Sequence, residues 1–160
     1  MRESPSTRPA SWDLALLAIC LLVFSVVAPP VFGQGGEGLL TLDRSTLKEG
    51  AFEGDAIVVF FASWSPRCRD VAERAKELEE KWGSRASVFL VAFQEGEEEV
   101  RDFLAGAQGE VDVLRDVDGS FSKRHGIITL PSLLVIESGS VAFRGRLPAD
   151  ADSVLRPIFG

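Results

Sequence analysis

One segment constrains the fold of this chain more than any other: a continuous run of apolar residues, AIVVFFA, at positions 56–62. Its β-branched and aromatic side chains favour a strand, and its unbroken apolar character predicts a central strand covered on both faces. After a turn at 63–67, apolar residues recur at helical spacing through 68–82, and charged residues fill the other positions. This pattern predicts an amphipathic helix. A buried strand that leads directly into such a helix is typical of α/β proteins.

The remaining segments complete a mixed pattern of strands and helices. We expect strands at 39–42, 87–93, 132–137 and 141–146, the last two joined by a hairpin turn at 138–140. We expect helices from Ser45 to near Gly50, at 97–105, from a turn at 118–119 to His125, and at 149–158. Residues 114–118 are expected only to lead into that turn. The order β-α-β-α-β-α-α-β-β-α predicts one mixed sheet with helices on both faces.

The N-terminal part of the chain has the pattern of a targeting segment. Residues 1–13 are polar and include Arg2 and Arg8, and residues 14–28 are dominated by Leu, Ala and Val. This apolar stretch suits a signal peptide and is short of the roughly 20 residues of a membrane span. Cleavage before Gln34 and retention as an uncleaved membrane anchor both remain open. We therefore predict a leader at 1–33, a Gly-rich linker at 34–38 and a domain at 39–160, located outside the cytoplasm.

Charge and cysteine content narrow the possible functions. The chain carries 17 Lys and Arg against 24 Asp and Glu, a net charge of −7, which disfavours nucleic acid as a partner. It has two cysteines, and Cys20 lies inside the apolar leader. The domain is left with Cys68 alone, so an intramolecular disulfide is impossible. A lone cysteine in an oxidising compartment is either buried and inert or a reactive thiol.

Two stretches of the domain resemble one known family. AIVVFFASWSPRCRD is similar to the active-site segment of thioredoxins, in which a buried strand leads into W-C-x-x-C and a helix. VLRDVDGSFSKRHGIITLPSLLVIESG resembles the TlpA/ResA-like branch, membrane-tethered thioredoxins of the bacterial cell envelope. The resemblance covers roughly residues 39–159. It implies the α/β thioredoxin fold, with a mixed central sheet flanked by helices on both faces.

The resemblance also implies a site and shows where this chain departs from it. Pro131 is implied to be the cis-proline that faces the active-site turn. A peptide-binding groove is then implied around that turn, formed by Trp64, Pro66, Arg67, Leu130 and Pro131. The nucleophilic cysteine of the family is replaced by Ser65. Because a hydroxyl is far less acidic than a thiol, Ser65 cannot attack a disulfide, and we expect its side chain to cap the following helix instead.

Two further positions disfavour dithiol chemistry. Family members often keep an acid six residues before the first cysteine or three residues after the second, and these positions hold Val59 and Val71. The remaining thiol, Cys68, corresponds to the resolving cysteine, which is mostly buried in the family. It is either a small buried hydrophobe or a single thiol that forms mixed disulfides, assisted by Arg67 or Arg69.

Three functions therefore remain open. The first is thiol–disulfide exchange through Cys68 with protein or peptide thiols of the cell envelope. The second is a non-catalytic module that binds peptides in the cis-proline groove. The third is a thiol peroxidase of the peroxiredoxin type, which Ser65 and Cys68 fit in spacing, although Phe61 occupies the motif's proline position and the assisting arginine would be Arg115 or Arg144.

No cofactor or metal is expected for any of these functions. His125, the only histidine, is explained by packing and lacks companion ligands. Trp82 is expected to pack against the core. The acids between 95 and 99 are interpreted as a solvated helix start rather than a calcium site.

Overall fold

The computed structural model describes residues 38–42, 47, 51–105 and 111–160. The chain divides into two units, Met1–Val31 and Phe32–Gly160, and every described residue belongs to the second. The predicted leader at 1–33, most of the linker at 34–38 and the helix expected from Ser45 to Gly50 lie outside the described residues, apart from single positions.

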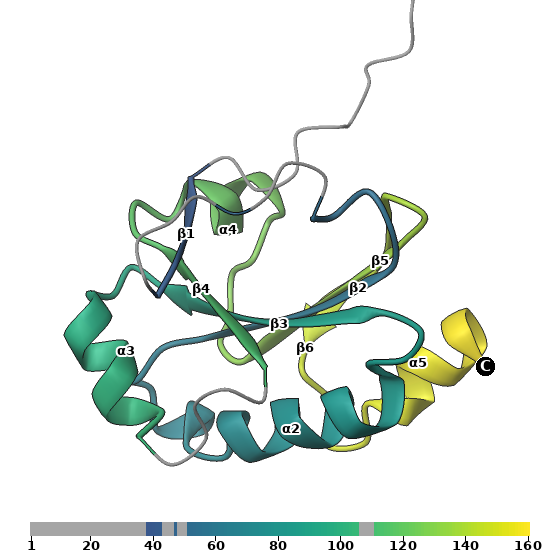
Figure 1. Ribbon diagram of the computed structural model, residues 1–160, viewed down its shortest axis with the longest axis horizontal. Coiled ribbons are helices and arrows are strands. Elements are labelled where there is room, and N and C mark those ends of the chain that lie inside the picture. The colour runs from purple at the N-terminus through teal and green to yellow at the C-terminus, as the bar shows by residue number, and fades with distance from the viewer. Residues whose placement is uncertain (1–37, 43–46, 48–50, 106–110) are drawn as a thin grey trace, which may run out of the picture. The chain divides into compact units, whose positions relative to one another are not determined.

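The described domain is built on one six-stranded sheet in the order β1-β4-β3-β2-β5-β6 (Figure 1). The strands are β1 (Leu39–Thr41), β2 (Ala56–Phe61), β3 (Ser87–Phe93), β4 (Asp112–Asp116), β5 (Ser132–Glu137) and β6 (Ser140–Arg146). β2, β3 and β4 run parallel, and the β1–β4, β2–β5 and β5–β6 pairs are antiparallel. The sheet is therefore mixed, as predicted.

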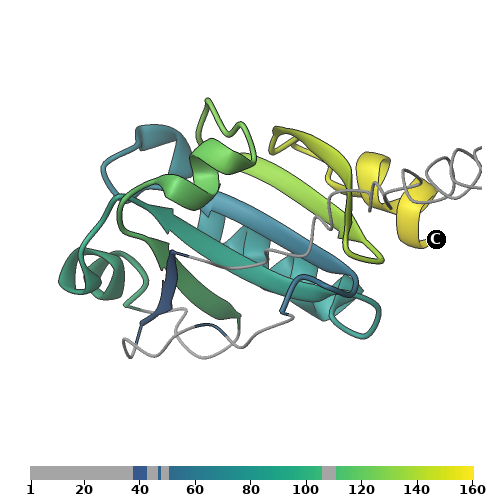
Figure 2. The same cartoon turned by 90° about the horizontal axis from the view of Figure 1, so that it is seen from above.

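The helices cover both faces of this sheet. They are the short 3-10 helix η1 (Pro66–Cys68), α2 (Val71–Trp82), α3 (Glu97–Phe103), α4 (Ser120–Arg124) and α5 (Asp152–Phe159). Buried residues of α2, α3 and α5 share one hydrophobic core with alternate residues of the central strands, and Phe121 of α4 belongs to the core on the opposite face. Figure 2 looks onto the sheet from the α4 side and shows α2 behind it.

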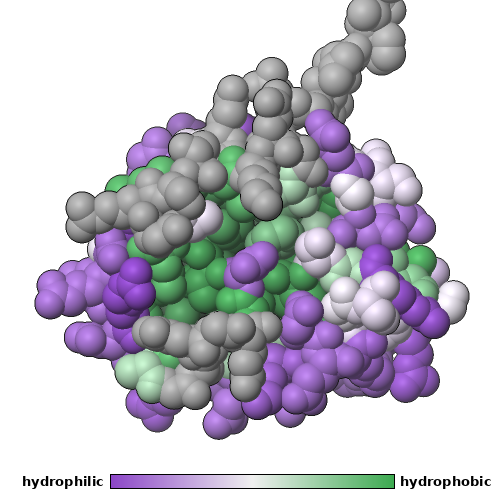
Figure 3. Space-filling view, viewed as in Figure 1, coloured by the Kyte–Doolittle hydropathy of each residue, from purple (hydrophilic) through white to green (hydrophobic). Residues whose placement is uncertain are grey.

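The central strand is β2, as its unbroken apolar run predicts. All six of its residues are completely buried, because β3 and β5 flank it and a core lies on each face. Val59 and Phe61 belong to the α2 core, whereas Val58 and Phe60 belong to the α4 core. Charged residues of α2 lie on its outer side, and hydrophilic residues gather along the edge of Figure 3 where Figure 1 draws this helix.

Two sequence expectations are wrong in detail. Residues 114–118, expected only to lead into a turn, overlap β4, which pairs with β3 on one side and β1 on the other. Its sequence, DVLRD, has too few apolar residues to signal a strand. The helix expected at 68–82 begins only at Val71, as α2, and Cys68 instead ends the separate short helix η1, with two residues between these helices. The hairpin expectation holds: Ser138 and Gly139 both adopt positive φ, 50° and 75°, which is the backbone of a tight turn between antiparallel strands.

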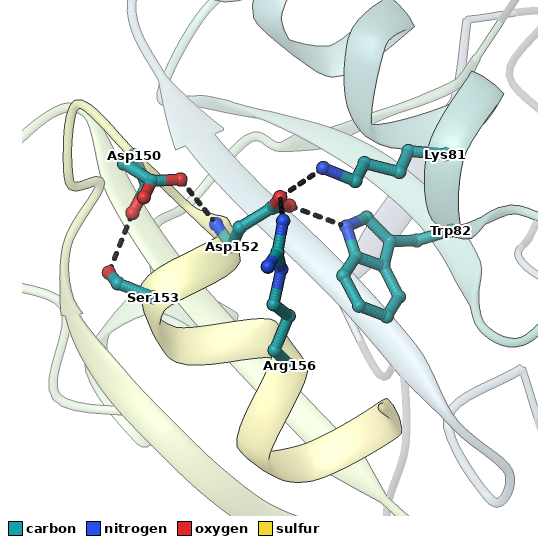
Figure 4. A network of polar contacts seen from close by, with 6 residues as sticks. All are labelled: Lys81, Trp82, Asp150, Asp152, Ser153 and Arg156. Carbon is teal, nitrogen blue, oxygen red and sulfur yellow. Dashed lines mark hydrogen bonds and ion pairs between the residues drawn. The ribbon is translucent and has the colours of Figure 1, made fainter.

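The C-terminal helix is fastened to α2 by a polar network (Figure 4). Asp152 of α5 accepts hydrogen bonds from Lys81, from Trp82 Nε1 at 3.2 Å and from Arg156 at 3.1 Å. The hydrogen bond from Lys81 is the main reason that the pKa of Asp152 lies below its ordinary value. Trp82 is otherwise buried in the core, as predicted.

Candidate functional site

The turn that follows β2 carries Trp64, Ser65 and Cys68. Its backbone is closed by two hydrogen bonds, from Ser65 N–H to the Ala62 carbonyl (3.1 Å) and from Cys68 N–H to the Ser65 carbonyl (2.9 Å). The second bond spans three residues and starts η1, which has Pro66 in its first turn. Proline suits this position because the first helical N–H has no intrahelical partner.

The side chain of Ser65 does not have the expected role. It stands at the N-cap position of η1, yet it makes no capping hydrogen bond, so the predicted cap is wrong. The backbone explains the difference, since Pro66 has no N–H and the Cys68 N–H already donates to the Ser65 carbonyl. Ser65 thus lies at the start of a short helix without capping it through its side chain.

Cys68 is a free thiol with none of its surface exposed. It belongs to the α2 core, together with Val59 and Val71, and both valines are also fully buried. The two positions where the resemblance implies acids are therefore filled by apolar core residues. In this structure the thiol meets neither solvent nor a carboxylate at those two positions.

A buried acid, Glu95, holds the start of the turn from the other side. It follows β3, is 7% exposed, and accepts hydrogen bonds from the Ser63 backbone N–H, at 2.9 Å to each carboxylate oxygen, and from the Ser63 hydroxyl. The interpretation of Glu95 as part of a solvated helix start is therefore wrong for this residue. A carboxylate that accepts a backbone N–H and a hydroxyl replaces its lost hydration shell with protein donors. It ties the end of β2 to the connection between β3 and α3.

A groove of about 480 Å³ opens beside this turn. It is lined by Trp64, Ser65, Pro66, Arg67, Phe93, Ile127, Ile128, Thr129 and Leu130. We call it the Trp64 groove. Its two sides are the turn after β2 and the loop between α4 and β5, which lie at the same end of the sheet (Figure 2). Trp64 is 66% exposed and Ile128 91% exposed, so large apolar side chains face solvent on both sides.

The structure brings together most of the residues that the sequence singled out. Trp64, Ser65, Pro66, Arg67 and Leu130 all line the groove. Pro131 is buried and does not line it, and the Leu130–Pro131 peptide bond is cis. Sequence reasoning missed Phe93, Ile127, Ile128 and Thr129. The apolar pair Ile127 and Ile128, placed in a loop rather than a strand, was the available signal.

The loop that carries Ile127 and Ile128 is anchored to α4 and β6. Ile127 N–H donates to the Ser122 carbonyl at 2.9 Å, and Arg144 Nη1 donates to the His125 carbonyl at 3.0 Å. The His125 ring packs on Phe121 with 4.5 Å between ring centroids, as the packing interpretation predicts. Burial lowers the pKa of His125, and the charges of Arg124 and Arg144 lower it further, against a smaller opposing effect of Asp116.

This environment predicts a pH dependence of stability. Because the folded pKa of His125 lies below 6.5, its unfolded value, the unfolded chain binds more protons between these two values. The free energy of unfolding is therefore fully retained above about pH 6.5 and falls as the pH drops toward the folded pKa. In thermal unfolding at a series of pH values, we expect His125→Phe to flatten this part of the profile relative to the unmodified protein. Parallel profiles for the two proteins between pH 7 and 5 would contradict the assignment.

The arginines of the peroxidase alternative lie elsewhere. Arg144 is engaged with the His125 carbonyl, and Arg115 is buried in β4, where its Nε has no hydrogen-bond partner among the residues that the structure describes. Neither lines the Trp64 groove. In the described part of the chain, no three His, Cys, Asp or Glu side chains are grouped as a metal site would need. Among the same residues, none of the helices combines the length and the apolar character that a membrane span requires.

The sheet order, the helices on both faces and the turn after β2 together define a thioredoxin fold, as predicted. Three solved structures with this architecture are similar over most of their length. The chain matches MTB dsbF (TM-score 0.64, 20% identity, 74% of this chain and 90% of that chain). It matches a secreted Mycobacterium tuberculosis disulfide oxidoreductase homologous to E. coli DsbE (0.63, 15%, 74% and 91%). It also matches the pneumococcal exposed lipoprotein thioredoxin Etrx1 of Streptococcus pneumoniae (0.63, 19%, 75% and 95%).

At these identities the similarity shows the fold and does not transfer an activity. No protein-family model matches the chain. No curated protein matches it either.

Proposed function

We propose that this chain is an extracytoplasmic thioredoxin-fold protein that binds extended peptide segments in the Trp64 groove and has lost dithiol exchange. The main support is the contrast between an exposed groove and a buried thiol in the same site. The groove is open and presents Trp64 to solvent, whereas Cys68, the thiol beneath the same turn, is completely buried. Ser65 occupies the position of the nucleophile. In this proposal the peptide-binding groove of a thioredoxin site is retained, and the reactive pair of thiols is not.

The apolar lining supports binding of a peptide rather than a small polar molecule. Burying apolar surface is favourable by about 25 cal/mol per Å², so Trp64 and Ile128, left 66% and 91% exposed, represent unused binding energy. A volume near 480 Å³ falls within the range of about 300 to 1,000 Å³ usual for ligand sites. Aromatic side chains that are exposed beside such a groove are typical anchors of protein interfaces.

The proposed location outside the cytoplasm is supported by the N-terminal apolar segment and by the descriptions of two similar structures. Residues 14–28 favour export, either as a cleaved signal or as a membrane anchor. Two of the similar structures are described as a secreted oxidoreductase and an exposed lipoprotein. The partners we propose are therefore proteins or peptides of the cell envelope, with attachment to the membrane where the leader is retained. The TlpA/ResA-like branch remains the proposed relative.

Selection from a random peptide library that lacks cysteine tests the proposal, because such peptides cannot form mixed disulfides. We expect the purified domain to select peptides, and Trp64→Ala to weaken the tightest of them at least about tenfold, as loss of an anchor does. Fluorescence anisotropy of the labelled peptide measures the affinity.

Two controls separate groove binding from its rivals. Val141→Ala removes another exposed apolar side chain, 52% exposed on β6, and is expected to leave affinity unchanged. Cys68→Ala, in a folded variant, is also expected to leave it unchanged. Capture that occurs only with cysteine-containing peptides, and is reversed by a reducing agent, would select monothiol exchange through Cys68 instead. Peroxide consumption that disappears in Cys68→Ser would select the peroxidase.

A further inference from the structure

Among the described residues that line the Trp64 groove, one is ionisable, Arg67. Six of its nine lining residues are apolar, two are the hydroxyl residues Ser65 and Thr129, and the ninth is this arginine. A single cation at the side of an apolar groove imposes a direction and a charge preference on anything that binds there. The identity of the occupant can be narrowed from this arrangement.

Within the described part of the chain, Arg67 has no partner. It is exposed and makes no hydrogen bond or ion pair with any described residue. Other arginines of the domain are engaged: Arg74 donates to the Pro148 carbonyl, Arg85 to the Phe159 carbonyl and Arg144 to the His125 carbonyl. The guanidinium of Arg67 therefore keeps its donors available, in a planar fork that matches a carboxylate.

Because the chain is acidic overall, the charge of Arg67 is expected to decide whether the groove accepts an acidic peptide. The net charge is −7, so an acidic peptide gains nothing from the protein as a whole and must be recognised by a local contact. Arg67 supplies that contact next to Trp64 and Pro66, which form the apolar part of the same turn. Because Arg67 is exposed, its pairing with a carboxylate is that of a surface ion pair, which contributes up to about 1 kcal/mol, or about fivefold in affinity, and most when the contact is bidentate.

We propose that the occupant of the Trp64 groove is an extended peptide segment in which a large apolar residue lies one or two positions from an aspartate or glutamate. The apolar side chain packs between Trp64 and Ile128, and the carboxylate pairs with the guanidinium of Arg67. This inference rests on the proposed peptide-binding function and names the class of segment that the groove selects.

The turn offers a matched control in Arg69. It is exposed, lies two residues from Arg67, makes no hydrogen bond or ion pair with any described residue, and does not line the groove. Arg67→Glu and Arg69→Glu change the net charge equally and at nearly the same place. A long-range effect of charge must therefore appear in both variants, whereas a direct contact appears only in the first.

The experiment uses the tightest peptide from the cysteine-free library and a copy in which its acidic residue is replaced by the corresponding amide. We expect Asp or Glu beside a large apolar residue to be enriched in the selection, and the acidic peptide to bind the unmodified protein about fivefold more tightly than the amide copy. Arg67→Gln is expected to remove this preference and Arg67→Glu to reverse it. Arg69→Glu is expected to keep both affinities within about twofold.

Selected peptides without acids, equal affinity for the two peptides, or equal effects of Arg67→Glu and Arg69→Glu would overturn the inference while leaving groove binding intact, provided that Trp64→Ala still weakens both peptides. A domain that selects no peptide, or whose affinity does not change in Trp64→Ala, would overturn the proposed function itself and this inference with it.

Discussion

Ser65→Cys is expected to give this protein a measurable rate of insulin disulfide reduction, which the unmodified chain is expected to lack. The change puts a thiol at the start of η1, beside the Trp64 groove, and a thiol ionises far more readily than a hydroxyl. The hydroxyl of the unmodified residue cannot ionise near neutral pH. The gain is therefore one of chemistry, in a fold that already has the architecture of thiol–disulfide oxidoreductases.

The geometry of the turn supports a disulfide between positions 65 and 68. The Cys68 N–H donates to the Ser65 carbonyl, so the two residues are separated by one turn of 3-10 helix. With three residues per turn and a rise of about 2 Å per residue, side chains three apart stand above one another at about 6 Å, within the range that a disulfide bridges. Cys68 would then resolve mixed disulfides from its buried position while the new thiol attacks from the side of the groove.

Thiol counting and turbidity of reduced insulin measure the result. In the domain without residues 1–33, which include Cys20, the oxidised variant is expected to show no free thiol in denaturant and two after reduction, whereas the unmodified domain retains one after the same treatment with glutathione disulfide. The double variant Ser65→Cys, Cys68→Ser should form mixed disulfides and fail to turn over. A folded Ser65→Cys protein that keeps two free thiols under these conditions would contradict the geometry and indicate that the turn has diverged along with its sequence.

Sequence reasoning predicted the central part of the fold because burial leaves a strong signature there. β3 and β5 have the predicted bounds and β2 differs by one residue, since strands covered on both faces require unbroken apolar runs. β4 was not predicted because it is held in the sheet by backbone pairing rather than by a run of buried apolar side chains. Only Val113 and Leu114 in its middle are apolar, and it holds its place through backbone bonds to β3 and β1. Long-range pairing of this kind leaves little trace in a short sequence.

Residues of the site that belong to a sequence motif could be predicted. Residues that join the site only through tertiary contacts were missed. Trp64, Arg67 and Leu130 were placed by the motif residues around them. Glu95 was misinterpreted because it begins an acidic stretch whose other members do start a helix, and only the fold shows that Ser63 approaches it from 32 residues away. Ile128 was missed because an apolar loop residue is usually explained by burial, and here it is 91% exposed.

Among substitutions of the polar residues that support the Trp64 groove, Asp116→Ala is expected to cause the largest loss of stability. Asp116 ends β4, is completely buried, and accepts the backbone N–H groups of Phe121 (3.1 Å) and Ser122 (2.7 Å) at the start of α4. Hydrogen bonds to a charged group contribute about 1.5 to 3 kcal/mol each, and their removal leaves two donors unsatisfied in the interior. Relief of the buried charge offsets part of this, so we expect the free energy of unfolding to fall by about 3 kcal/mol.

Asp118→Ala is the matched control for this substitution. Both acids belong to the same D-x-D-G segment and both accept a backbone N–H at the start of α4, since Asp118 binds Ser120 N–H at 2.9 Å. This bond lowers the pKa of Asp118, but the residue is exposed, so water replaces the lost partner and only a small change in stability is expected. Urea denaturation of the two variants measures the difference directly.

Asp116→Ala should weaken peptide binding in the Trp64 groove under conditions where the domain is still folded. α4 leads into the loop that carries Ile127 and Ile128, and Ile127 N–H is bonded to the carbonyl of Ser122, one of the two residues that Asp116 holds. Release of α4 therefore frees one side of the Trp64 groove, and the affinity for the selected peptide should fall in Asp116→Ala at temperatures where the sheet remains folded. Faster hydrogen exchange at residues 120–127, with unchanged exchange in β2 and β3, would be the accompanying sign. Equal stability of the Asp116 and Asp118 variants would mean that burial of the first carboxylate contributes nothing, and would remove the link between this motif and the groove.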